Sequence, residues 1–161
     1  MEQGAQAAAE RRKVGMVLPP PFLLVGLIVI CGLAHALWLG WPPLLPLRAL
    51  SGLILAIAGL ILIGSCGKVF RKAGTPVRPV SPTTTIVSAG AYRFSRNPMY
   101  VGMAGVLAGI AVFFGSYLLG VAVLVFVAVV HFGVVLPEER YLEALHGRAY
   151  LEYKGRVRRW L

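Results

Sequence analysis

Side chains capable of chemistry gather in two short segments of this sequence. The first runs from Arg96 to Tyr100 and supplies a guanidinium, an amide and a phenol. The second begins with the adjacent carboxylates of Glu138 and Glu139 and continues as a basic segment rich in tyrosine. Two very hydrophobic runs lie between the two segments. We therefore expect a polar site built at the surface of a membrane, at the end of a helical hairpin.

The acidic residues are few, and their positions limit where a site that needs an acid can form. The chain has no Asp and six Glu, and Glu2 and Glu10 belong to the N-terminal tail. The other four lie between Glu138 and Glu152. Any acidic site must therefore include the segment that follows the last hydrophobic run.

Several kinds of chemistry can be weighed for such a site. A carboxylate pair beside a region of low dielectric attracts cations, so it could hold an ammonium group or a ribose diol, or act as a base. Two adjacent Glu without nearby His or Asp offer few ligands, so no metal site is predicted. A Ser-His-Asp triad is excluded because the chain has no Asp.

The elements that must position these residues are membrane helices. Hydrophobic residues make up 58% of the 161 positions, charged residues 14%, and the mean hydropathy is +0.77. Apolar runs fall at about residues 22–39, 44–64, 99–114 and 117–136, and about 20 residues cross a bilayer as a helix. The third run is short for a span. We predict an all-α integral membrane protein with about four transmembrane helices: a mobile tail (1–18) and a single domain (19–161).

The basic residues predict the orientation. Of sixteen Lys and Arg, three lie in the tail, six in residues 68–96, six in residues 140–159, and Arg48 alone follows the first span. With four spans the three rich groups face one side, which the positive-inside rule makes cytoplasmic, while Trp38 and Trp41 anchor the opposite face. Since these cations flank membrane spans, we expect them to attract anionic lipid headgroups rather than nucleic acid.

The C-terminal segment has helical periodicity beyond Pro137, which marks the predicted end of the fourth span. One helical face carries residues at steps of three and four: Glu139, Leu142, His146, Tyr150, Tyr153 and Val157. Gly147 interrupts this pattern and predicts a kink. Tyrosines following a carboxylate are unusual for a simple membrane anchor, although a structural amphipathic helix is an alternative.

The isolated His and Cys residues within the apolar runs carry no metal-ligand spacing. His35 and His131 are interpreted as packed polar residues. Cys31 and Cys66 are interpreted as small core residues. Asn97 followed by Pro98 predicts a helix start, whose free N–H groups also suit a carboxylate or phosphate.

Both polar segments resemble a known superfamily. The motifs Gly90-Ala91-Tyr92-Arg93 and Arg96-Asn97-Pro98-Met99-Tyr100-Val101-Gly102 are similar to the characteristic block of the isoprenylcysteine carboxyl methyltransferase and phospholipid methyltransferase superfamily. The C-terminal run matches the same superfamily at its spacing: Glu138-Glu139, Leu142, Gly147, Tyr150, Tyr153, Val157 and Arg159. The resemblance covers about residues 68 to 161.

The resemblance implies an integral membrane enzyme that uses S-adenosylmethionine without a Rossmann fold. It implies a cytoplasmic cofactor pocket closed by the C-terminal segment and a lipophilic acceptor that enters from the bilayer. Glu139 and Arg159 are the catalytic candidates it indicates. The cofactor-binding candidates are Val87, Gly90, Tyr92, Arg96, Asn97, Tyr100, Gly102, Glu138, Glu139, Leu142, Tyr150 and Tyr153.

The chain also departs from the superfamily's pattern. Asn97 stands where many members have His, and His146 replaces an aromatic residue before the glycine. Isoprenylcysteine-specific enzymes carry an Arg shortly before the Glu pair to bind the substrate carboxylate, whereas residues 131–135 here include none. This favours another lipid or a small amphiphilic acceptor. Two further functions stay open: an NADPH-dependent membrane reductase of the sterol-reductase type, and a non-catalytic membrane scaffold.

Overall fold

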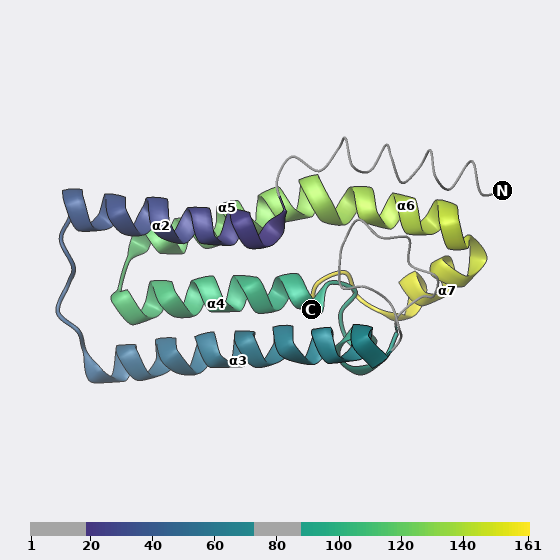
Figure 1. The fold of residues 1–161 in the computed structure, drawn as a ribbon, viewed down its shortest axis with the longest axis horizontal. Coiled ribbons are helices and arrows are strands. Elements are labelled where there is room, and N and C mark those ends of the chain that lie inside the picture. Colours follow the sequence, from purple (N-terminus) through teal and green to yellow (C-terminus); the bar gives the residue numbers. More distant parts are fainter. Residues whose placement is uncertain (1–18, 73–87) are drawn as a thin grey trace. The chain divides into compact units, whose positions relative to one another are not determined.

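The computed structural model describes residues 19–72 and 88–161, and in them the chain is almost entirely helical (Figure 1). The tail at 1–18 and the candidate Val87 lie outside the described residues. The elements are α2 (Pro20–Trp38), α3 (Pro46–Lys72), the 3₁₀ helix η1 (Gly90–Arg93), α4 (Pro98–Phe114), α5 (Tyr117–Val130), the π-helical segment η2 (His131–Val135), α6 (Leu136–His146) and α7 (Arg148–Arg156). The predicted all-α membrane fold is confirmed.

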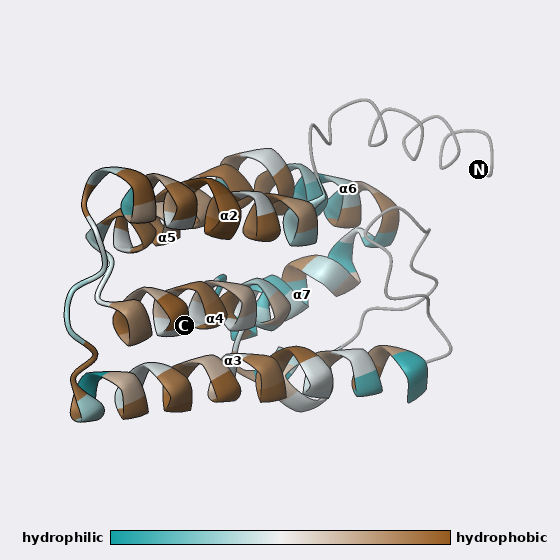
Figure 2. Cartoon of the chain, turned by 60° about the vertical axis from the view of Figure 1, so that its left-hand side comes forward, coloured by the Kyte–Doolittle hydropathy of each residue, from teal (hydrophilic) through white to brown (hydrophobic). Residues whose placement is uncertain are grey.

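Within residues 19–72 and 88–161, three helical stretches are long and apolar enough to cross a bilayer. They are Pro20–Trp38, Pro46–Lys72 and Tyr117–His146, with 19, 27 and 30 residues. The helix Pro98–Phe114 is also apolar but shorter, as its sequence predicted. Figure 2 shows hydrophobic residues dominating α2, α4 and α5, and hydrophilic residues gathering on α6 and α7.

The chain divides into two compact units. The apolar unit contains the described residues up to Ile63 and the stretch from Met99 to Val130. The polar unit contains the end of α3 from Gly64, the described residues up to Pro98, and everything from His131 onward. The two polar segments identified in the sequence, residues 96–100 and the stretch from Glu138 onward, belong mainly to the polar unit.

Glycines bring α3 and α4 into close contact within the apolar unit. A Cβ atom added at Gly59 would lie 2.6 Å from the carbonyl oxygen of Gly102, and one at Gly52 would lie 2.7 Å from that of Gly109. Both distances are far below van der Waals contact, so only glycine permits this approach. Small residues at a contact allow membrane helices to pack closely in this way. Helix α2 packs instead beside α5.

The last span continues without interruption into the polar unit. The membrane span is predicted to end at Pro137, and the helix itself continues through this residue to His146. A proline ring clashes with the carbonyl four residues earlier, and the π-helical turn at His131–Val135 is where the helix accommodates it. Gly147, with φ of +53°, then ends α6 and separates it from α7. The periodic face is therefore divided between two short helices.

Candidate functional site

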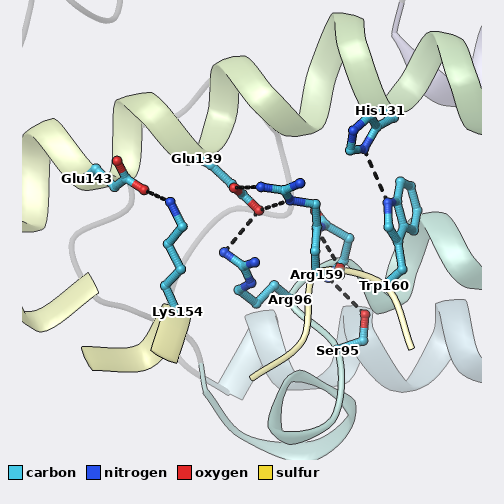
Figure 3. Close-up of polar contacts among 9 residues, drawn as sticks. Ser95, Arg96, His131, Glu139, Glu143, Lys154, Arg159 and Trp160 are labelled. Atoms are coloured by element: carbon cyan, nitrogen blue, oxygen red, sulfur yellow. Dashed lines mark hydrogen bonds and ion pairs between the residues drawn. The ribbon is translucent and has the colours of Figure 1, made fainter. Parts of the chain in front are cut away.

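A buried carboxylate flanked by two guanidinium groups forms the centre of the polar unit (Figure 3). Glu139 lies in the first turn of α6 and is only 5% exposed. Arg159 donates from Nε to Oε1 at 2.9 Å and from Nη2 to Oε2 at 3.0 Å, while Nη1 of Arg96 lies 3.0 Å from Oε1. We call Arg96, Glu139 and Arg159 the ionic cluster. Its three members come from distant parts of the sequence.

Arg96 is the member with unused hydrogen-bonding capacity. Its side chain is 8% exposed, and Nη1 reaches Glu139 at ion-pair distance without the alignment of a hydrogen bond. Within residues 19–72 and 88–161, neither Nε nor Nη1 has a hydrogen-bond partner. A buried charged donor without a partner is costly. Arg96 therefore has the capacity to bind a further acceptor.

The final residues of the chain lie against the segment that precedes α4. The backbone N–H of Arg96 donates to the carbonyl of Arg158 at 2.9 Å, and Nδ2 of Asn97 donates to the carbonyl of Arg159 at 2.9 Å. Further on, Nε1 of Trp160 donates to Nδ1 of His131 at 3.2 Å. Hydrogen bonding to Glu139 raises the pKa of Arg159, so this residue keeps its charge. We call residues 157–161 the C-terminal strap.

Two buried tyrosines on α7 complete the surroundings of the ionic cluster. The hydroxyl of Tyr153 donates to the carbonyl of Tyr92 at 2.8 Å. Burial raises the pKa of both Tyr150 and Tyr153 to about 12; for Tyr150 the carboxylate of Glu139 raises it further, and the guanidinium of Arg96 opposes the shift. Both phenols are therefore neutral hydrogen-bonding groups at physiological pH.

The structure brings most of the predicted site residues into the polar unit. Those in direct contact there are Tyr92, Arg96, Asn97, Glu139, Tyr150, Tyr153 and Arg159. Glu138 and Leu142 are half-buried on α6. Gly90 begins η1 with φ of +60°, and a Cβ added there would lie 2.9 Å from a methyl group of Val69. A cofactor contact remains a prediction for each of these residues.

Two candidates lie in the apolar unit instead. Tyr100 is buried near the start of α4. Gly102 packs against α3, because a Cβ added there would lie 2.8 Å from the carbonyl oxygen of Gly59. The observed role of Gly102 is close helix packing, and its part in a cofactor site stays a prediction.

Sequence reasoning missed several partners in the polar unit. Ser95 accepts the backbone N–H of Asn97 at 3.1 Å and forms an isolated parallel bridge with Arg158. Lys154 pairs with Glu143 across the α6–α7 turn. These contacts depend on the break at Gly147 and on the path of the strap. No local pattern predicts them, since none joins residues three or four positions apart on one helix, as the exposed pair of Arg148 and Glu152 does.

The fold and this site define a class: a helical integral membrane protein with a buried, arginine-rich polar site. The family model described as "Phospholipid methyltransferase" matches residues 47–149. The chain belongs to the phospholipid methyltransferase family, a family of membrane methyltransferases. It is also 35% identical over 63 residues to an uncharacterized protein of Haemophilus influenzae, covering 39% of this chain and all of that protein. No solved structure matches the present chain.

Proposed function

We propose that this protein transfers a methyl group from S-adenosylmethionine to a lipophilic or amphiphilic acceptor at the cytoplasmic face of the membrane. Membership of the family supports methyl transfer. The observation that carries the proposed cofactor site is the buried Nε of Arg96, which has no hydrogen-bond partner within residues 19–72 and 88–161, beside the carboxylate of Glu139.

The residues of the polar unit fit the polar groups of S-adenosylmethionine. The cofactor has a carboxylate, an ammonium group, a ribose diol and an adenine ring. The Nε donor of Arg96 matches the carboxylate, because guanidinium and carboxylate form short, charge-assisted hydrogen bonds. Glu138 and Glu139 match the ammonium or ribose groups, and Tyr150 and Tyr153 offer rings and neutral hydroxyls to the adenosine.

When bound, S-adenosylmethionine supplies an electrophilic methyl group on a sulfonium. Such a displacement disperses charge, so the protein must align the reactants and exclude water more than it must supply a strong base. Arg159 holds the strap to α6 through Glu139, and Asn97 holds it to the start of α4. In this proposal the C-terminal strap excludes water from the site. Glu139 orients the side chains of Arg96 and Arg159.

The sidedness and the acceptor class follow from charge and hydropathy. Fifteen of the sixteen Lys and Arg lie in the tail or in the two basic segments that the positive-inside rule assigns to the cytoplasm. The candidate spans are strongly apolar, which suits an acceptor with a hydrocarbon portion. The absence of Arg from residues 131–135 argues against a prenylcysteine carboxylate.

Labelling of membranes tests this function. Membranes containing the protein are incubated with methyl-labelled S-adenosylmethionine, and the extracted lipids are separated. We expect a labelled lipid with the wild type and with Arg148→Gln, whose side chain is 93% exposed. Arg96→Gln should reduce the label at least about tenfold, which corresponds to one charge-assisted hydrogen bond. Equal labelling by Arg96→Gln and wild type would contradict the assigned site.

A further inference from the structure

The apolar unit contains a second polar cluster that the methyl-transfer proposal does not use. It lies where α2 and α4 end and α3 and α5 begin. Its two basic members are His35, at the end of α2, and Arg48, in the first turn of α3. They flank the same short turn, because His35 bonds to Ser116 and Arg48 packs on Gly115.

His35 is buried with one ring nitrogen unpaired. The residue is 2% exposed, and its Nδ1 lies 3.0 Å from Oγ of Ser116. That oxygen also accepts the backbone N–H of Leu119 at 3.3 Å, so we assign the Ser116 hydroxyl as the donor to Nδ1. The proton of the neutral imidazole is then on Nε2, which has no hydrogen-bond partner in the described part of the chain.

Arg48 is a cation without a counterion. It is the one charged residue in the sequence of the apolar unit, which has no Asp or Glu. Its Nη2 donates to the carbonyl of Pro43 at 2.5 Å, but its buried Nε has no partner among residues 19–72 and 88–161. A Cβ at Gly115 would lie 2.6 Å from Cζ of Arg48, so a glycine is required for this packing.

Aromatic side chains surround this cluster. The ring of Trp41 lies 4.7 Å from that of His35 and 5.0 Å from that of Phe114, and Tyr117 meets His35 edge-on at 5.7 Å. Trp41 is 45% exposed and Tyr117 61% exposed. Trp and Tyr are enriched where the hydrocarbon meets the headgroups of a bilayer, so these rings favour a lipid headgroup as the occupant of the cluster.

We propose that Arg48 and His35 bind the phosphate group of a membrane phospholipid. Both side chains present N–H donors, one carries a permanent positive charge, and the apolar unit offers no acid to neutralise it. A phosphate supplies the missing acceptors and the missing charge. This site does not depend on the proposed methyl transfer, because every residue that forms it belongs to the apolar unit.

Thermal unfolding of the purified protein in detergent tests the site. The probes are dihexanoyl phosphatidic acid, dihexanoylglycerol, which has the same chains without phosphate, and inorganic phosphate. We expect the phosphatidic acid to raise the melting temperature while the other two have little effect. Equal shifts with both lipids would overturn the phosphate contact, and an equal shift with inorganic phosphate would overturn a lipid as its source.

Substitutions at Arg48 test whether phosphatidic acid binds at this cluster. Arg48→Gln should weaken the apparent affinity for phosphatidic acid by more than about tenfold, the loss expected for a charge-assisted contact. Arg148→Gln removes the same charge from an exposed position and should bind as the wild type does. Arg48→Lys retains the charge without the Nε donor and should bind with intermediate affinity, which guards against misfolding of Arg48→Gln. Wild-type affinity in Arg48→Gln and Arg48→Lys would refute the proposal.

Discussion

Arg159 and Glu139 are joined by two parallel hydrogen bonds, from Nε to Oε1 at 2.9 Å and from Nη2 to Oε2 at 3.0 Å. A paired contact of this kind is stronger and more directional than a single ion pair. It fixes the C-terminal strap to α6, while Arg96 lies against the same carboxylate. One buried acid thus holds together three parts of the polar unit.

Removing that acid should destabilise the protein. Glu139→Gln leaves Arg96 and Arg159 without their counterion, and losing one partner of a buried pair costs about 3 kcal/mol. We expect a loss of that size in the free energy of unfolding, measured by denaturation in mixed micelles. Glu152→Gln is the control, because its carboxylate is 61% exposed and should contribute less than about 0.5 kcal/mol. Equal effects of the two variants would show that Glu139 is not a structural centre.

The hydroxyl of Tyr153 should make a measurable contribution to stability. Tyr153→Phe removes the buried hydrogen bond to the carbonyl of Tyr92 and should cost about 1 kcal/mol in the free energy of unfolding. Tyr117→Phe, at a position 61% exposed, should have a much smaller effect. No difference between the two variants would argue against the contact between α7 and η1.

Close packing of α3 on α4 predicts a contrast between two glycines of the same helix. A Cβ added at Gly59 would lie 2.6 Å from the backbone of α4, whereas nothing lies within 4 Å of one added at Gly64. Gly59→Ala should lower the free energy of unfolding by about 2 kcal/mol through overpacking. Gly64→Ala should be neutral or slightly stabilising, because alanine favours helices. Similar melting temperatures for both variants would contradict the close approach.

Alkaline pH should reveal the raised pKa of Tyr150, the buried tyrosine beside the ionic cluster. Tyr150 has a pKa of about 12 in the folded protein, raised by burial, against an ordinary value of 10. Between these values the unfolded chain loses the proton while the folded one retains it, so stability falls as the pH rises from 10 to 12. Tyr150→Phe should flatten the dependence of the melting temperature on pH in this window. An unchanged slope would show that Tyr150 titrates normally.

The sequence predicted the helices and the main members of the site for identifiable reasons. Long apolar runs define the spans, and the steps from Glu139 to Tyr153 correctly placed one carboxylate and two buried tyrosines near each other. It could not predict where the strap lies, because the contact of Asn97 with Arg159 joins residues 62 positions apart. Nor does any local pattern predict the donation from Trp160 to His131.

Other features of the fold depend on tertiary packing, which a rule based on a single residue type does not include. The membrane span is predicted to end at Pro137, and the π turn before this residue allows the helix itself to continue. Gly147 was expected to kink one helix and instead divides it into two. Gly102 matches a superfamily motif, yet its observed neighbours are on α3. Glycine suits both a ligand contact and a helix contact, so residue type alone does not distinguish them.

The central claim is that the polar unit binds S-adenosylmethionine through Arg96 and Glu139. Calorimetric titration of the purified full chain with S-adenosylhomocysteine, the product form of the cofactor, tests it most directly. We expect saturable binding by the wild type and by Arg148→Gln, at least about tenfold weaker binding by Arg96→Gln, and no binding of NADPH. Binding of NADPH instead of S-adenosylhomocysteine, or wild-type affinity in Arg96→Gln, would contradict the claim.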